Sequence, residues 1–151
     1  MFVDTKSVKF FSKKTLTKHQ LRTVICAFAS SMNVKKVTFS KRAKYVAGTY
    51  NCINRVIFID MKQNRKNILL TFFHELAHHI SCSKGKWLEY HNNATTPLIS
   101  ASAKFDIENK IDKLAKKLWY KHVDIKQWGK YKYGYPKSQS KRITRWLVDN
   151  Y

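Results

Sequence analysis

The chain has 151 residues, 44% of them hydrophobic, and carries 30 Lys and Arg against 9 Asp and Glu, a formal net charge of +21. This length and hydrophobic content suit a single domain with its own core, and plentiful aromatics with few Gly and Pro exclude an extensively disordered chain. No apolar run reaches the length of a secretory signal or a membrane span, so we expect a soluble, cytoplasmic protein without a membrane partner.

The excess of positive charge bears on binding partners rather than on the fold. Nucleic acid, an acidic protein or an anionic surface would each suit such a charge. The alternative is compositional, because lysines distributed along most of the chain can simply form a solvated surface. Both interpretations stay open.

Three cysteines are scattered along the chain. Cys26, Cys52 and Cys82 show neither the spacing of a metal site nor a paired framework. We therefore expect a reducing compartment, and we expect Cys82 to be a small buried residue at the end of a helix.

The first half of the chain predicts one helix followed by a small sheet. Thr15 can cap a helix over residues 16–31, whose apolar residues recur at helical spacing. Three short runs rich in β-branched and aromatic residues then predict strands, with a plausible hairpin turn at residues 51–54. The predicted strands are residues 34–39, 45–50 and 55–60.

The next part of the chain predicts two helices separated by a loop. Asn64 can cap the first helix, which contains the apolar run from Ile68 to Ile80, and Gly85 can end it. A loop over residues 83–102, which contains Pro97, can cover a cleft, and a second helix is expected from about residue 103 to 120. The expected fold class is α+β, within one domain that spans residues 1–151.

The sequence His74-Glu75-Leu76-Ala77-His78 lies inside that apolar run and reads H-E-x-x-H. Residues four apart lie on the same face of a helix, so both imidazoles can bind one metal ion. Glu75 is rotated by about 100° from the pair, close enough to meet a water bound to the same metal. The simpler interpretation is an amphipathic helix with two structural histidines.

The second helix supplies candidate partners for these histidines. A zinc site with two helical histidines needs a third protein ligand, often a carboxylate, and Glu108 begins an apolar-striped helix 30 residues after His78. Asp112 falls one turn after Glu108 on the same face and can accept the distal N–H of a zinc-bound imidazole. The alternative is a solvated helix with acid–lysine pairs.

H-E-L-A-H followed about thirty residues later by E-x-x-x-D-x-x-A resembles the gluzincin pattern. It is most similar to the small ImmA/IrrE-type zinc metallopeptidases of bacteria and phages, over residues 37–118. The resemblance implies a minimal zincin-like fold with a short sheet before the H-E-x-x-H helix. It also implies zinc on His74, His78 and Glu108, with Glu75 as the general base.

The same resemblance implies that Asp112 supports a zinc-bound imidazole from behind. The chain departs from the family pattern E-x-x-A-D at Ile111, where the family has alanine, and this substitution adds bulk between the two helices.

SprT-like proteases are the second resemblance, because they take a third His downstream of H-E-x-x-H. His91 follows His78 by 13 residues and is the candidate for that role. The glycine and aromatic that usually follow such a histidine are absent from residues 92–94, so Glu108 is favoured. His79 is expected to point away from the ligand face.

The expected function is zinc-dependent hydrolysis of peptide bonds, with substrate extended along an edge strand. The transition-state oxyanion needs a donor, and Tyr90, His91, Tyr120 and His122 are the candidates. Two alternatives from other classes remain. One is a nucleic-acid-associated zincin-fold protein that cleaves repressors or DNA-crosslinked proteins, and the other is an inactive structural zinc protein.

A basic, aromatic extension begins at about residue 122. Between Lys126 and Arg145, rings alternate with cations, so Trp128, Tyr131 or Tyr133 can stack on bases while lysines contact phosphates. The alternative is an extension whose rings cover the helices while its lysines face water.

Overall fold

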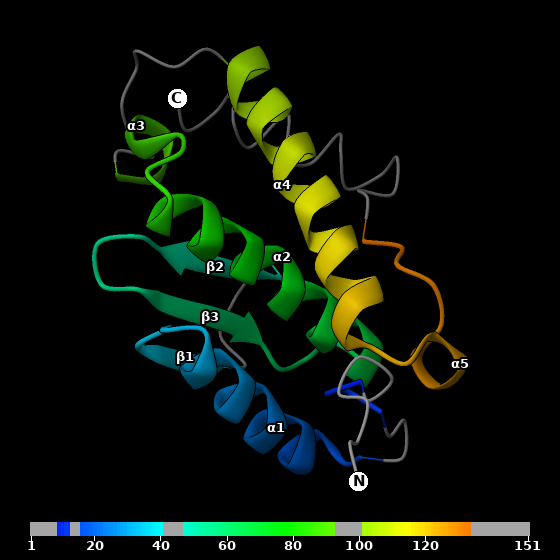
Figure 1. Cartoon of the computed structure of the whole chain (residues 1–151). Helices are drawn as coiled ribbons and strands as arrows, with labels where there is room; N and C mark the ends of the chain where they lie inside the picture. Colours follow the sequence, from blue (N-terminus) through cyan, green and yellow to red (C-terminus); the bar gives the residue numbers. More distant parts are fainter. Residues whose placement is uncertain (1–8, 13–15, 41–46, 93–100, 134–151) are drawn as a thin grey trace, which may run out of the picture.

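The structure is a computed structural model that describes residues 9–12, 16–40, 47–92 and 101–133, and every structural statement below refers to these residues. They form five helices and a three-stranded sheet (Figure 1), which confirms the predicted α+β class. In chain order the elements are α1 (Lys18–Ser31), β1 (Lys36–Ser40), β2 (Gly48–Asn51), β3 (Val56–Asp60), α2 (Arg65–Ser83), α3 (Leu88–Asn92), α4 (Ala101–His122) and α5 (Ile125–Trp128).

The sheet has the strand order β1-β3-β2. β1 is parallel to β3, and β2 is antiparallel to it, so β1 and β2 are the two edges. The predicted hairpin turn between β2 and β3 is confirmed, and the Asn51 side chain stabilises it by accepting a hydrogen bond from the backbone N–H of Asn54 at 3.0 Å.

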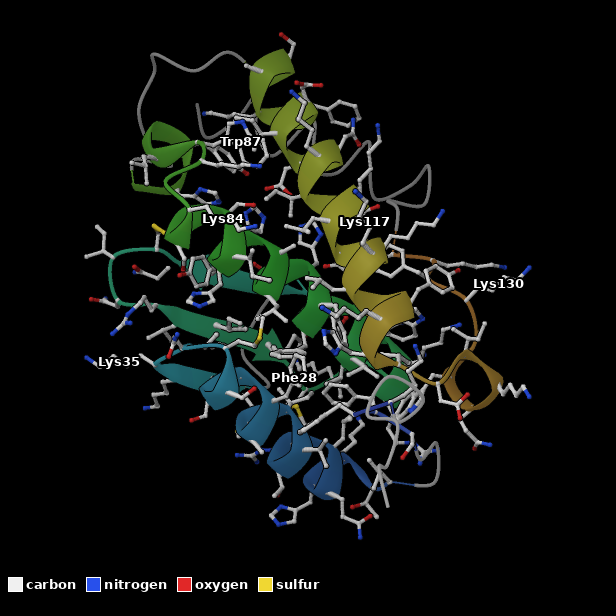
Figure 2. All side chains as sticks on the ribbon, in the orientation of Figure 1. Phe28, Lys35, Lys84, Trp87, Lys117 and Lys130 are labelled. Carbon is white, nitrogen blue, oxygen red and sulfur yellow. A yellow bond between two sulfur atoms is a disulfide. The ribbon has the colours of Figure 1, made fainter. Side chains whose placement is uncertain are left out.

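The helices cover one face of this sheet. Ile57 and Ile59 of β3 point to the same face and are fully buried, while the other three residues of the strand are partly exposed. Phe28 of α1 meets Phe72 and Phe73 of α2 at ring-centroid distances of 6.1 and 6.0 Å, and Figure 2 shows Phe28 between these two helices. α1, α2 and β3 therefore share one core.

α2 is the central helix of the fold. Every residue from Ile68 to His79 is buried, so this helix is enclosed on nearly all sides rather than amphipathic. α4 lies against it, with Ile111, Ala115 and Trp119 in the common core. The H-E-x-x-H sequence is thus placed in the interior, where its polar groups need partners.

The start of α1 differs from the expectation. The N-cap is Thr17, not Thr15, which lies outside the described residues. Thr17 Oγ1 accepts from the N–H of Gln20 at 3.1 Å, and Gln20 Oε1 accepts from the N–H of Thr17 at 2.9 Å. This reciprocal capping box satisfies two backbone donors, which fixes the helix start at this position. By contrast, the predicted cap of α2 is confirmed, since Asn64 accepts from the N–H of Asn67 at 2.8 Å.

The predicted loop over residues 83–102 was wrong in its first part. It contains the one-turn helix α3, and α4 already begins at Ala101. A single turn is too short to produce a helical repeat in the sequence, so periodicity could not find it. Pro97 lies outside the described residues.

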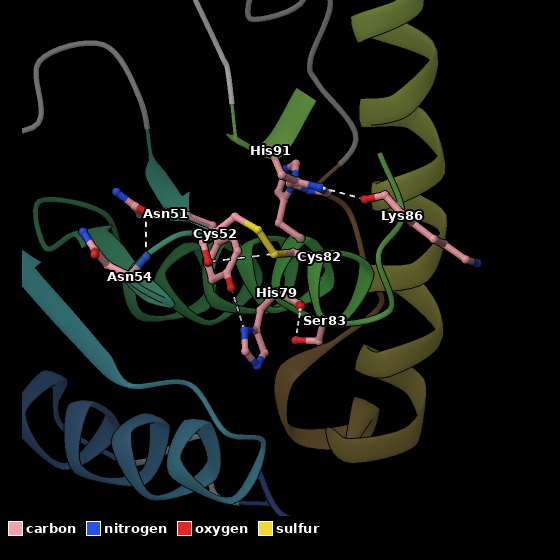
Figure 3. Close-up of a disulfide and its surroundings, with 10 residues drawn as sticks. Asn51, Cys52, Asn54, His79, Cys82, Ser83, Lys86 and His91 are labelled. Carbon is pink, nitrogen blue, oxygen red and sulfur yellow. Dashed lines mark hydrogen bonds between the residues drawn. A yellow bond between two sulfur atoms is a disulfide. The ribbon is translucent and has the colours of Figure 1, made fainter. Parts of the chain in front are cut away.

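The expectation that no cysteines pair was also wrong. A disulfide joins Cys52, in the β2–β3 turn, to Cys82, at the end of α2 (Figure 3), with a Cα–Cα distance of 6.1 Å. The two residues are 30 positions apart and meet only because α2 runs back along the hairpin. Cys26 is exposed and free. The cysteine-based argument for a reducing compartment therefore no longer holds.

Among the described residues, no helix is long and apolar enough to cross a membrane.

Loss of this disulfide should destabilise the fold. Cys52→Ser is expected to lower the free energy of unfolding by about 2–4 kcal/mol, because the cross-link restricts the unfolded chain. Cys26→Ser is the matched control and should change stability by no more than about 0.5 kcal/mol, since Cys26 is unpaired. Urea unfolding with and without reductant measures both variants. Equal stability of the oxidised and reduced wild-type chain would contradict the expectation.

Candidate metal centre

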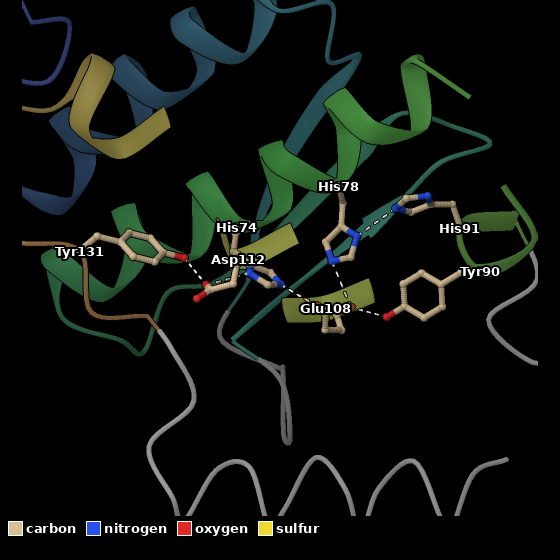
Figure 4. Close-up of polar contacts among 7 residues, drawn as sticks. All are labelled: His74, His78, Tyr90, His91, Glu108, Asp112 and Tyr131. Carbon is tan, nitrogen blue, oxygen red and sulfur yellow. Dashed lines mark hydrogen bonds and ion pairs between the residues drawn. The ribbon is translucent and has the colours of Figure 1, made fainter. Parts of the chain in front are cut away.

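Two helices bring the predicted ligands together. His74 and His78 project from one face of α2 toward α4, which carries Glu108 (Figure 4). His74 Nε2 lies 2.9 Å from Glu108 Oε2, and His78 Nε2 lies 3.2 Å from Glu108 Oε1. One ligand atom from each of the three residues lies within 4.8 Å of the others, so this buried group could hold a metal ion.

The donor set fits a divalent cation. Metal–nitrogen and metal–oxygen bonds of about 2.0–2.1 Å at a tetrahedral ion place ligand atoms about 3.3–3.4 Å apart. The His78–Glu108 distance is close to this value, and the His74–Glu108 distance is shorter. Burial by itself would lower the pKa of His74, but the neighbouring carboxylates of Asp112, Glu108 and Glu75 raise it to about 10. A cluster of carboxylates that raises a buried imidazole pKa this far attracts positive charge, either a proton or a metal ion.

The pKa of Glu108 is shifted in the opposite direction, below its ordinary value. Burial would raise the pKa of its carboxyl, but the charge of His78 and hydrogen bonds with His74 and His78 hold that pKa well below its usual range. Glu108 is therefore an ionised carboxylate that faces both imidazoles, the state in which it can bind a metal.

Asp112 lies on the Nδ1 side of His74, at ion-pair distance but too far for the predicted direct hydrogen bond. His74 Nδ1 lies 3.7 Å from Asp112 Oδ1, and the hydroxyl of Tyr131 donates to the same Asp112 oxygen. A carboxylate facing Nδ1 favours a proton there, while Nε2 donates to the ionised Glu108. A metal ion would have to displace that Nε2 proton. Tyr131 was not predicted for this position, because only the folded chain brings residue 131 back against α4.

His91 lies behind His78 and not at the metal position. His78 Nδ1 and His91 Nε2 are 3.0 Å apart, and His91 Nδ1 lies 3.1 Å from the carbonyl oxygen of Lys86. Because a carbonyl oxygen only accepts, His91 donates from Nδ1 to Lys86 and accepts at Nε2 from His78. Burial and then the neighbouring His78 lower the pKa of His91, which keeps its ring neutral. The Nε2 of His78 faces Glu108, the carboxylate that accepts from it.

The short helix α3 carries two of these contacts. It places His91 against His78, and it places Tyr90 so that its hydroxyl donates to Glu108 Oε1. Of the other two oxyanion candidates, Tyr120 is engaged by the backbone N–H of Tyr131 at 3.4 Å, and the His122 ring stacks on Phe73 in the core. The structure therefore brings Tyr90 and His91 to the cluster, but not Tyr120 or His122.

Glu75 is buried beside the three clustered residues. Burial raises the pKa of its carboxyl, and the charges of His78 and His74 partly oppose this shift. The ring of Tyr133 lies 4.9 Å from that of His74, and its hydroxyl is hydrogen-bonded to Thr71. Burial and then the Glu75 charge raise the Tyr133 pKa, so this phenol stays neutral. Of the two interpretations that the sequence left open for Tyr133, its position fits a ring that covers the helices, because it packs against His74.

His79 has a structural role, as expected. Its Nε2 donates to the carbonyl oxygen of Met32 at 2.8 Å, and its Nδ1 accepts from the hydroxyl of Tyr50 at 2.8 Å. The imidazole thus links α2 to the end of α1 and to β2.

Gly48 explains how closely β2 approaches the centre. A Cβ at this position would lie 2.6 Å from both the carbonyl oxygen of Phe58 and Cγ2 of Thr71, and 3.4 Å from Cγ of Glu75. Only glycine allows the strand to pack this tightly against the turn of α2 that carries Glu75.

Gly48→Ala should therefore be destabilising by about 1–3 kcal/mol, because the added methyl overpacks this contact. Thr49→Ala is the matched control in the same strand, at an exposed position, and should have a much smaller effect. Thermal unfolding of both variants measures the difference. A Gly48→Ala chain as stable as wild type would show that β2 and α2 are not in close contact here.

His91→Phe should weaken metal binding by about 10–100-fold, because the ring volume remains but the acceptor that orients His78 is lost. His19→Phe, at an exposed position on α1, is the control and should bind metal as wild type does. Competition with a chromophoric chelator measures both affinities. Unchanged affinity would contradict the orienting role, and complete loss of binding would make His91 a ligand.

No protein-family model, curated protein or solved structure matches this chain. The functional assignment is therefore built on the residues of the centre and their geometry.

Proposed function

We propose that the chain is a zinc-dependent metallopeptidase of gluzincin type, similar to the ImmA/IrrE-type enzymes. The observation that carries the proposal is that Glu108 faces the Nε2 atoms of both histidines while Glu75, equally buried, is left outside the ligand group. A purely structural zinc site closes its coordination with four protein ligands, whereas three ligands leave a position for water and substrate.

Zinc suits this donor set of two imidazoles and one carboxylate, and it would supply there a water of pKa about 7 and a polarised substrate carbonyl. His74, His78 and Glu108 would hold it. Asp112 and His91 keep the two imidazoles in the tautomer that this role needs.

Glu75 is the proposed general base. Its pKa is raised by burial, which makes the carboxylate a stronger proton acceptor than an exposed glutamate. Glu75 takes the proton of the attacking water on a side-chain oxygen and returns it to the nitrogen of the departing amine. Tyr90 is the proposed donor to the carbonyl oxygen in the transition state, since its hydroxyl lies at Glu108.

The proposed substrate is a peptide extended along β2. This strand is an edge of the described sheet and meets α2 at Glu75 through Gly48. An added strand gives affinity through main-chain hydrogen bonds, which any peptide sequence can make.

Glu75→Gln separates catalysis from structure. The variant should keep one zinc per chain and the wild-type melting temperature but lose about 10²–10⁴-fold in cleavage rate, because the amide cannot take a proton. Glu108→Gln is the contrasting variant and should lose zinc as well. Zinc content and cleavage of fluorescently labelled casein measure both. If zinc-loaded wild type and Glu75→Gln are equally active, Glu75 is not the catalytic base. If both are inactive, the result contradicts the proposed peptidase and supports the alternative of an inactive structural zinc protein.

A further inference from the structure

The second half of α4 and the segment after it carry a concentration of positive charge. Between residues 113 and 132 the chain has seven lysines and one acid, Asp124. All seven lysines are exposed. We call them the lysine ridge: Lys113, Lys116, Lys117, Lys121, Lys126, Lys130 and Lys132.

The described residues around the ridge do not neutralise it. None of its lysines forms a salt bridge with another described residue. Asp124 is occupied as the N-cap of α5, where its carboxylate accepts from the backbone N–H of Lys126 at 3.0 Å. An uncompensated group of like charges raises the local positive potential, which attracts polyanions.

The ridge also has a regular geometry on α4. Lys113, Lys117 and Lys121 follow each other at four-residue spacing, so they form a row on one face with a rise of about 6 Å between neighbours. The opposite face, with Ile111, Ala115 and the metal-centre residue Glu108, points toward α2. Figure 2 shows Lys117 and Lys130 on the side of the molecule away from α1.

We propose that the lysine ridge binds the phosphate backbone of double-stranded nucleic acid without reading its sequence. A duplex presents one charge per about 3.4 Å of axis on each strand, and long flexible lysines spaced about 6 Å apart on a rigid helix can reach such a series of phosphates. A membrane surface fits less well, because a helix that binds lipid needs an apolar face beside its basic one, and the apolar face of α4 is buried in the core.

The described aromatic residues near the ridge do not favour base stacking, which is one of the two interpretations of the sequence pattern. Trp128 and Tyr131 are only 4% and 8% exposed, and Tyr133 lies against His74. Trp128 and Tyr131 are too buried to stack on bases, and the packing of all three rings favours the alternative in which they cover the helices. The described part of the chain offers phosphate contact through lysines, which depends on charge alone. The rest of the predicted nucleic-acid segment, residues 134–145, lies outside the described residues.

The test is the binding of the full chain to a fluorescein-labelled 30-base-pair DNA duplex, measured by anisotropy from 50 to 200 mM NaCl. Log affinity should fall linearly with log salt, with a slope of about −0.9 per phosphate contacted. The variant Lys113→Gln/Lys117→Gln/Lys121→Gln should bind more weakly. Its salt slope should be smaller in magnitude by about 2.7. The fold-loss of its affinity across this salt range should therefore be roughly 40 times smaller than that of wild type.

The control variant is Lys35→Gln/Lys36→Gln/Lys62→Gln, which removes the same charge from exposed positions around β1 and β3. Circular dichroism confirms that both variants are folded, and this control should keep the wild-type slope. Equal effects of the two variants would overturn the proposal, because binding would then follow net charge and not the ridge. Absence of binding at 50 mM NaCl would also overturn the proposal. Competition by polyglutamate that is as effective as competition by duplex DNA of matched charge would overturn it as well.

Discussion

The contact of Glu108 with His74 and His78 is the interaction on which the rest of the structure depends. α2 is buried on nearly all sides, so its two imidazoles and Glu75 lie in the interior and need partners there. α4 supplies the partner carboxylate, and in doing so it completes the core around α2. Removing one member of such a buried charged group typically costs about 3–5 kcal/mol, because the others are left uncompensated.

The surrounding contacts position the three residues that could hold a metal ion. Asp112 and His91 each contact the Nδ1 side of one histidine, so both Nε2 atoms are directed into the same space. Tyr131 holds Asp112, and the Lys86 carbonyl holds His91, which extends the orienting contacts to segments far apart in the sequence. These outer contacts hold the three side chains in place, which would reduce the cost of organising them around a cation.

The ligand residues could be predicted because their spacing carries the chemistry. His74 and His78 are four residues apart on a helix, and Glu108 is an acid on a second helix with an apolar stripe. The sequence also indicates the cap at Thr17, since Gln20 follows three residues later as a capping box requires. The prediction of Thr15 overlooks this pair.

Other features depend on contacts between segments far apart in the chain. The Cys52–Cys82 disulfide needs the hairpin to meet the end of α2, and the role of His91 needs a helix of five residues. The alternation of rings and lysines after residue 122 fits both a core extension and a nucleic-acid surface. Only burial shows that Trp128 and Tyr131 belong to the core while the neighbouring lysines face solvent.

X-ray absorption at the zinc edge, recorded on the zinc-loaded chain, tests the ligand set most directly. Our account predicts two imidazole ligands and oxygen ligands at about 2.0–2.1 Å, with the oxygen contribution reduced in Glu108→Ala. The number of imidazoles should stay at two in His91→Phe. A third imidazole in the wild-type spectrum that disappears in His91→Phe would contradict the account, because it would place His91, and not Glu108, at the metal.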